Sequence, residues 1–103
     1  MTNLFDYLAE NKRSAIILLK KYFKDNNCDT LSIIDNDVYY PYVLIGDRHN
    51  NISDLFVTKV RLSQNNDKIE FYIEELEEWI PDNYCLSTTA NNVYITIEQV
   101  LED

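Results

Sequence analysis

Hydrophobic side chains recur at helical spacing over the first quarter of the chain. Between residues 3 and 25 they stand three, four or seven positions apart, at Leu4, Leu8, Ala15, Leu19, Tyr22 and Phe23. This spacing predicts an amphipathic helix over residues 3–25, because it places the apolar side chains on one face of 3.6-residue turns. A bend over residues 10–13 is the alternative, with Ser14 capping a second helix.

Short strand-like segments follow the helix. Residues 31–34 predict a short strand, residues 35–37 a turn, and residues 38–46 a second strand rich in aromatic and β-branched side chains. Pro41 stands inside this second strand and cannot donate a hydrogen bond to a neighbouring strand. The strand is therefore expected to lie at an edge there or to carry a bulge. Residues 46–54 are expected to form a loop.

Residues 55–64 and 67–74 predict a β-hairpin around a two-residue turn, Asn65-Asn66. One face of this hairpin pairs Leu62 with Ile69, Val60 with Phe71 and Thr58 with Ile73. The other face pairs Arg61 with Glu70 and Lys59 with Tyr72. A shift of one residue would turn both cations into the core, so the sequence specifies this register well.

The remaining segments are a bend and a terminal element. Residues 74–81 predict a bend or a single helical turn that ends at Pro81. Leu76, Trp79 and Ile80 are expected to fold back toward the core, while Glu75, Glu77 and Glu78 stay in water. Residues 93–97 alternate as a strand would, but Tyr94, Ile97, Val100 and Leu101 have helical spacing. A C-terminal helix over residues 90–101 is favoured, with Ser87, Thr88 or Thr89 as its cap.

These elements predict a single α+β domain over residues 1–103. It contains an N-terminal helix, a four-stranded, mostly antiparallel meander and a C-terminal helix. The first helix is expected to cover the hairpin face that carries Val60, Leu62, Ile69, Phe71 and Ile73. Tyr40 and Tyr42 share one face of their strand and Tyr39 takes the other. Either one sheet face stays exposed as an interaction surface, or each helix covers one face.

The composition fits one soluble domain and leaves few residues for tight turns. The 103 residues are 46% hydrophobic and contain one Gly and two Pro. Turns that need a positive φ therefore fall to Asn and Asp, with Asn pairs at 26–27, 50–51, 65–66 and 91–92 as candidates. The chain has no apolar run of membrane-spanning length and no signal-peptide pattern, so a cytoplasmic location is expected. Cys28 and Cys85 are then expected to be free thiols.

Charge is distributed unevenly along the sequence. Residues 1–24 contain five basic and two acidic side chains, a local charge of +3. The other 79 residues contain four basic and sixteen acidic side chains, a local charge of −12, which gives the net charge of −9. A surface of this sign repels phosphates and anionic lipids, so neither nucleic acid nor a membrane is expected as a direct partner.

Residues for catalysis or metal binding are sparse. The one histidine, His49, has Asp47 and Ser53 nearby in sequence, but no nucleophile elbow accompanies them. Residues 35–37 resemble the start of a calcium loop but lack its Gly and its later carboxylate. One Gly cannot build a phosphate loop. We therefore expect no enzyme activity, cofactor, metal or catalytic residue. A small-molecule or weak hydrolytic site near His49 is the alternative.

Two segments carry a resemblance in style to a group of bacterial proteins. These are EEWIP and TTANNVYITIEQVLE, a tryptophan after an acidic strand end and an Asn-Asn-Val-Tyr segment that opens the last helix. The chain is similar in this to the small, acidic, uncharacterised proteins of gut Bacteroidales. The resemblance implies a bacterial protein, often associated with mobile elements, and it implies no activity.

Surfaces remain as the functional feature. The expected function is a non-enzymatic protein-interaction or regulatory module that contacts another protein through Tyr72, Glu74, Glu75, Glu77, Glu78 and Trp79. An alternative is a DNA mimic that inhibits a basic nucleic-acid-binding enzyme or a defence system, because residues 67–103 hold ten acids and one Lys. A homodimer could form if the strand around Pro41 paired across a two-fold axis.

Overall fold

The computed structural model describes residues 4–34, 41–46 and 51–102. Its elements are α1 (Leu4–Asn26), β1 (Leu31–Ser32), β2 (Tyr42–Gly46), β3 (Ile52–Leu62), β4 (Ile69–Ile73), β5 (Glu78–Pro81), the 3₁₀ turn η1 (Asp82–Tyr84) and α2 (Ser87–Leu101). Every strand pair is antiparallel. The predicted α+β class, with a helix before and a helix after an antiparallel sheet, is confirmed, although the sheet has five strands in the described residues rather than four.

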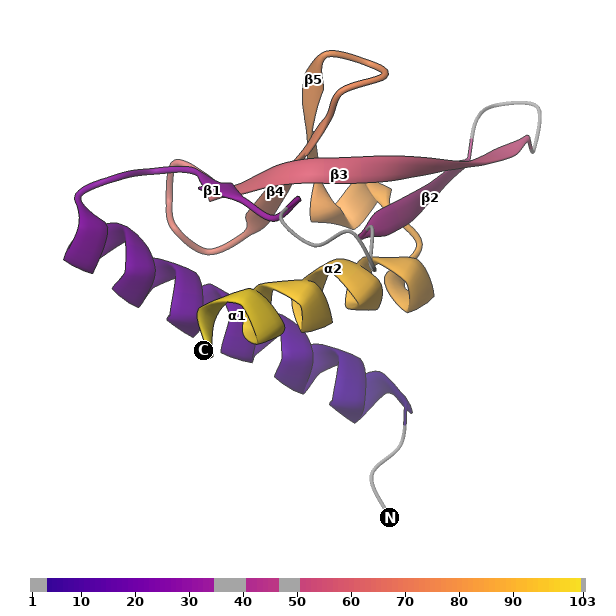
Figure 1. Cartoon of the computed structure of the whole chain (residues 1–103). Coiled ribbons are helices and arrows are strands. Elements are labelled where there is room, and N and C mark those ends of the chain that lie inside the picture. The colour runs from indigo at the N-terminus through magenta and orange to yellow at the C-terminus, as the bar shows by residue number, and fades with distance from the viewer. Residues whose placement is uncertain (1–3, 35–40, 47–50, 103) are drawn as a thin grey trace.

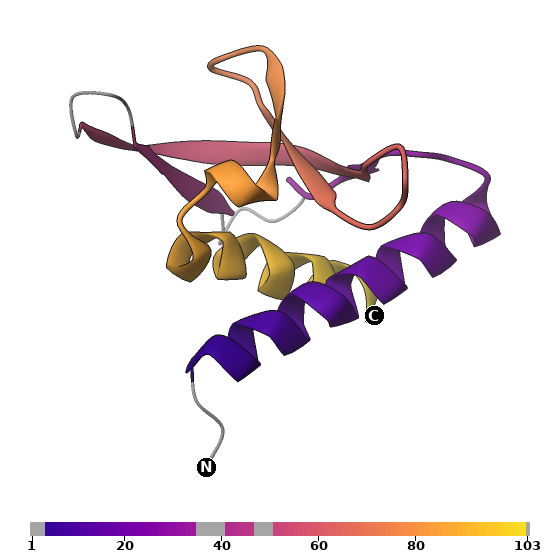
Figure 2. The same cartoon turned by 180° about the vertical axis from the view of Figure 1, so that it is seen from behind.

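Both helices lie on the same face of the sheet (Figures 1 and 2). α1 packs mainly against α2, and α2 contacts β2, so the two helices together cover the hairpin. The expected packing of α1 on the hairpin face is therefore confirmed in part, since α1 contacts β3 and shares its core with the hairpin, while α2 covers the sheet beside it. The shared core includes the buried apolar residues Ala15, Leu19, Val43, Val57, Val60, Ile69, Phe71, Ile73, Val93 and Ile97.

α1 is one continuous helix, without the alternative bend at residues 10–13. It ends where Asn27 adopts a φ of 52°, and the N–H of Cys28 donates to the carbonyl oxygen of Phe23 at 3.2 Å. This is a left-handed helix end, which Asn tolerates better than most residues. Asn66, with a φ of 59°, confirms a second predicted asparagine turn. The pair at 91–92 is instead helical.

β3 is the long central strand of the sheet. β1 and β2 pair with successive stretches of it, and β2 pairs residues 42–46 with residues 56–52. The predicted loop over residues 46–54 is therefore wrong at Gly46 and from Ile52 onward, because these residues pair as strands, and residues 47–50 lie outside the described residues. Pro41 lies just before β2, and its carbonyl oxygen accepts the N–H of Val57 at 2.9 Å. The turn predicted at 35–37 and residues 38–40 lie outside the described residues.

The predicted register of β3 and β4 is confirmed at four pairs: Leu62 with Ile69, Arg61 with Glu70, Val60 with Phe71, and Lys59 with Tyr72. The fifth pair is wrong, because Ile73 pairs with Val57 and a β-bulge leaves Thr58 as the extra residue. Val57 and Val60 are three positions apart, so a regular strand would turn them to opposite faces. The bulge lets both enter the core.

The turn between β3 and β4 is wider than predicted. The N–H of Ser63 donates to the carbonyl oxygen of Lys68 at 2.8 Å, which closes a four-residue loop over residues 64–67. The hydroxyl of Ser63 also donates to Asp67 Oδ1 at 2.9 Å. Residues 64 and 67 therefore belong to the loop and not to the strands. The wider loop leaves the predicted pairing of Leu62 with Ile69 unchanged.

Of the bend or single helical turn predicted over residues 74–81, the structure shows a bend at residues 74–77, and a fifth strand that was not predicted follows it. Residues 74–77 form a tight turn in which Glu77 has a φ of 53°, and β5 then returns along β4. Leu76 lies at this turn and is exposed, so the expectation that it folds inward is wrong. Trp79 and Ile80 lie on opposite faces of β5. Ile80 packs against the core as predicted, whereas the expectation that Trp79 folds toward the core is wrong, because its ring lies beside Tyr72 on the other face.

The C-terminal helix favoured over residues 90–101 is confirmed and begins three residues earlier, at Ser87. Leu86 is its N-cap residue, so none of the three predicted caps holds that position. Thr89 Oγ1 donates to the carbonyl oxygen of Leu86 at 2.7 Å. The N–H of Leu86 donates to the carbonyl oxygen of Leu44 at 3.3 Å, which ties the start of α2 to β2.

Candidate interaction surface

The sheet face that points away from both helices, here called the outer face, carries two aromatic rings in contact. Tyr72 of β4 and Trp79 of β5 are cross-strand partners, and their ring centroids lie 5.2 Å apart. Both side chains are half-buried, while their strand neighbours Phe71 and Ile73 enter the core. The structure thus brings together the two aromatic residues of the predicted contact surface.

Cations from β3 lie over these two rings. The guanidinium carbon of Arg61 is 4.2 Å from the Trp79 centroid, and Lys59 Nζ is 5.4 Å from the Tyr72 centroid. Arg61 Nε also donates to Glu70 Oε1 at 2.6 Å, which confirms the predicted charge pairing. Each cation–ring contact at an exposed position contributes about 0.5–1 kcal/mol. We call these five residues the outer cluster.

The predicted acidic residues stand at the end of the β4–β5 hairpin. Glu74, Glu75 and Glu77 lie in the turn and are exposed. Glu78 is exposed as well, but it pairs with Ile73, so its position alternates away from that of Trp79. The acidic residues therefore rim the outer cluster at one end rather than form a single surface with it. The cations Lys59 and Arg61 give the outer face a mixed charge.

The outer face continues onto β2 and the first half of β3. Tyr42 and Phe56 are cross-strand partners and both are exposed, whereas Val43 and Val57 beside them are buried. Since both helices cover the other side, the open question about the tyrosine-rich strand is answered for Tyr42, which lies on an uncovered face. Tyr39 and Tyr40 lie outside the described residues.

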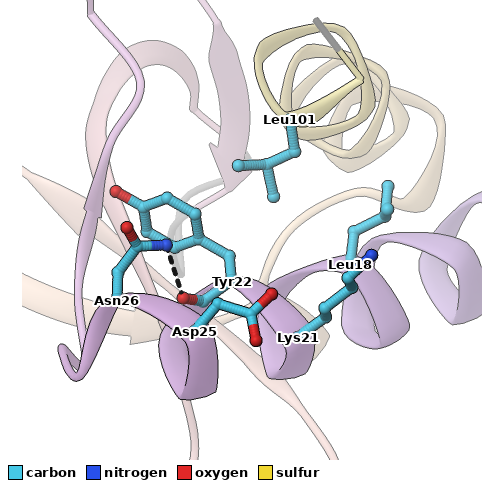
Figure 3. A pocket seen from close by; sticks show the side chains of 6 residues that line it. All are labelled: Leu18, Lys21, Tyr22, Asp25, Asn26 and Leu101. Carbon is cyan, nitrogen blue, oxygen red and sulfur yellow. Dashed lines mark hydrogen bonds between the residues drawn. The ribbon is translucent and has the colours of Figure 1, made fainter.

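Two hollows adjoin the described elements. One, of about 160 Å³, lies between the C-terminal halves of α1 and α2, where Leu101 points toward Tyr22 (Figure 3). It is smaller than the roughly 300–1,000 Å³ of small-molecule sites. The other, of about 450 Å³, is an open depression between the β3–β4 loop and η1, with Glu70 and Tyr84 in its wall. Its lining consists mostly of polar side chains of the β3–β4 loop.

The carboxyl group of Asp82 is buried on the helix side of the molecule, which the sequence pattern did not predict. Asp82 is only 4% exposed, and its Oδ2 accepts the hydroxyl of Tyr94 at 2.7 Å and Lys12 Nζ at 3.1 Å. Its Oδ1 is buried without a hydrogen-bond partner among the described residues. The two contacts link η1 to both helices. Nothing local marks Asp82 as buried, because Lys12 is distant in sequence.

The burial and negative charge around Asp82 disfavour the ionised forms of two neighbouring side chains, Cys85 and Tyr94. Burial, followed by the charge of Asp82, raises the pKa of the Cys85 thiol from 9.0 to about 11. Burial raises the pKa of Tyr94 far above its ordinary value, and the charge and hydrogen bond of Asp82 add to the effect. A thiol that stays protonated is a poor nucleophile.

The two cysteines should therefore differ in reactivity. Both are free thiols, Cys85 being buried and Cys28 half-buried. At a pH of about 8 we expect iodoacetamide to alkylate Cys28 in the folded chain while Cys85 stays unmodified, since only the thiolate reacts. Mass spectrometry of the peptides measures both, and urea should make both react. Equal native rates would contradict the burial of Cys85.

Stability should fall at alkaline pH. Between pH 9 and 11 the unfolded chain releases the Cys85 proton that the folded chain retains, so the unfolding free energy decreases as pH rises through that window. Tyr94 acts in the same direction above pH 10.0. We expect thermal unfolding of the Cys85→Ala variant to be less sensitive to pH between about 8 and 10.5 than that of the parent. Identical slopes would contradict the linkage.

Other expectations concern residues or properties away from this face. His49, with Asp47, lies outside the described residues. Within residues 4–34, 41–46 and 51–102, no three His, Cys, Asp or Glu side chains gather where a metal ion could bind. Neither described helix combines the length and apolar composition that crossing a bilayer requires.

Comparisons with protein families, curated proteins and solved structures found no match.

Proposed function

We propose that the chain is a non-enzymatic interaction or regulatory module that binds another protein through the outer face of its sheet. The observation that carries the proposal is the position of both helices on one side, which leaves the Tyr72–Trp79 pair uncovered on the other. Exposed aromatic residues with a polar rim are typical of protein-binding surfaces, and Trp, Tyr and Arg are the residues that most often dominate binding energy.

The charges around the two rings indicate which groups a partner needs on its own surface. Lys59 and Arg61 lie beside the rings, and the carboxylates of Glu74, Glu75 and Glu77 rim the hairpin end. A partner that matches this surface presents an apolar centre with basic groups on the side that meets the turn. Such complementarity steers association and fixes orientation more than it adds affinity.

An affinity capture with a matched control tests the proposal. The immobilised chain is exposed to lysate of its own host, beside the variants Trp79→Val and Tyr84→Val. Tyr84 is an exposed aromatic residue of η1, 71% accessible and outside the outer cluster. We expect a partner that the parent and Tyr84→Val retain and Trp79→Val loses. Circular dichroism of each variant verifies the fold. Equal retention by all three, or no specific partner at all, contradicts the proposal.

The DNA-mimic alternative makes a different demand on the same protein. A mimic must compete with duplex DNA for a basic enzyme, and binding must weaken steeply once salt shortens the Debye length below about 10 Å. Replacing Glu74, Glu75, Glu77 and Glu78 together by Gln should then abolish binding, while Trp79→Val leaves it largely intact. The two cations of the outer cluster, which a phosphate-like surface would lack, favour the interaction module.

A further inference from the structure

The side of α1 that faces away from α2 and the sheet carries a basic stripe. Arg13, Lys20 and Lys24 are exposed and lie at helical spacing around Ile17, and the exposed Lys21 stands at the edge of this face, where it also lines the hollow between α1 and α2. Glu10 and Asp25 are exposed acidic residues at the two ends of the stripe. Between described side chains the ion pairs are Lys12–Asp82 and Arg61–Glu70, so none of these four cations pairs with a described carboxylate. We call this surface the basic face.

An apolar side chain stands at the centre of the basic face. Ile17 is 61% exposed, whereas Ala15 and Leu19, two residues before and after it on the same helix, are fully buried. An exposed aliphatic group with charges around it has the apolar centre and polar rim of a small contact surface. The occupant that suits it has an apolar centre of its own and carboxylates around it.

The β4–β5 turn of the same chain has that composition. Leu76 is 45% exposed and stands between Glu74 and Glu75 on one side and Glu77 and Glu78 on the other. The turn and the basic face thus carry opposite charges, each around one exposed aliphatic side chain. A tight hairpin end is also narrow enough to meet a single helix face.

One molecule cannot make this contact with itself. The β4–β5 turn projects from the sheet away from the helix layer, and α1 lies on the far side of that layer (Figures 1 and 2). We infer that the chain associates with a second copy of itself, the turn of one copy docking on the basic face of the next. The β4–β5 turn belongs to the surface of the proposed function as well, whereas the basic face of α1 has no part in that function.

Head-to-tail contacts of this kind leave a free turn and a free basic face at the ends of each assembly, so association is open-ended. One hairpin end on one helix face is smaller than a standard interface, which makes the contact weak and rapidly reversible. Self-association should therefore grow with protein concentration without reaching a fixed stoichiometry.

Sedimentation over a concentration series tests the inference with two matched pairs of variants. Ile17→Ser and Ile52→Ser remove aliphatic groups of the same exposure, 61%, and Ile52 lies on β3 away from both surfaces. Leu76→Ser and Leu86→Ser form the second pair, at 45% and 44%. We expect Ile17→Ser and Leu76→Ser each to weaken self-association about tenfold and the two controls to leave it unchanged.

Charge reversal provides an independent test of the pairing. A chain with Lys20→Glu and Lys24→Glu, and a chain with Glu75→Lys and Glu77→Lys, should each be monomeric alone and associate when mixed. A parent chain that is monomeric at every concentration overturns the inference, as does equal weakening by Ile17→Ser and Ile52→Ser. Capture of a partner that depends on Trp79 would still support the proposed function in that case, so the two failures are distinguishable.

Discussion

A proline in place of Tyr72 is expected to unfold the domain. Tyr72 lies in the middle of β4, which pairs with β3 on one side through Lys59 and with β5 on the other through Trp79. Proline removes a backbone donor and its ring restricts φ, so it is excluded from strands that have neighbours on both sides. A domain of this size is stable by only about 5–15 kcal/mol, and losing the central pairing removes the packing of β5 as well.

The variant Tyr72→Thr separates the backbone effect from the loss of the ring. Threonine suits a strand and removes the contacts with Trp79 and Lys59, which at a half-exposed position are worth about 1 kcal/mol together. Circular dichroism and thermal unfolding measure both variants. Native-like melting of Tyr72→Pro would show that the described hairpin is wrong, whereas a folded Tyr72→Thr is expected.

Truncating Phe71 should be the most costly side-chain change. Phe71 has no exposed surface, and its ring lies 6.0 Å from the ring of Tyr94, so it joins the sheet to α2. Removing a fully buried phenylalanine ring costs about 3–5 kcal/mol through lost burial and the cavity left behind. Phe71→Ala should lower the urea midpoint correspondingly.

Phe56 provides the matched control for that measurement. It lies on the outer face of β3 and is exposed, so Phe56→Ala should cost less than about 1 kcal/mol. A similar loss in both variants would contradict the assignment of one buried and one open sheet face. The comparison therefore tests the same asymmetry on which the proposed function rests.

The helices and the hairpin register could be predicted because they depend on local periodicity. Apolar spacing identifies α1 and α2, and the opposition of Arg61 and Glu70 fixes β3 against β4. The bulge at Thr58 was foreseeable only from the spacing of Val57 and Val60, which breaks strict alternation. β5 was missed because five acidic or apolar helix-compatible residues precede Trp79, and the positive φ of Glu77 that closes the turn is rare for that residue.

The residues of the candidate surface could be predicted from the sequence, but their arrangement could not. Tyr72 and Trp79 stand out in the sequence, but their contact requires β5, which the acidic segment concealed. Asp82 could not be recognised as buried, since its burial depends on Lys12 and Tyr94 from two helices that pack only in the folded chain. Long-range packing, not local pattern, decides such positions.

The most direct test of the outer face as a contact surface uses the fluorescence of Trp79, which is the only tryptophan in the chain. Its ring is half-buried in the free protein, so a neutral quencher such as acrylamide reaches it. When a captured partner is added at saturation, we expect quenching to fall and the emission maximum to move to shorter wavelength, because the partner covers the ring. Unchanged quenching and emission while the partner is bound would place the contact elsewhere and contradict the account.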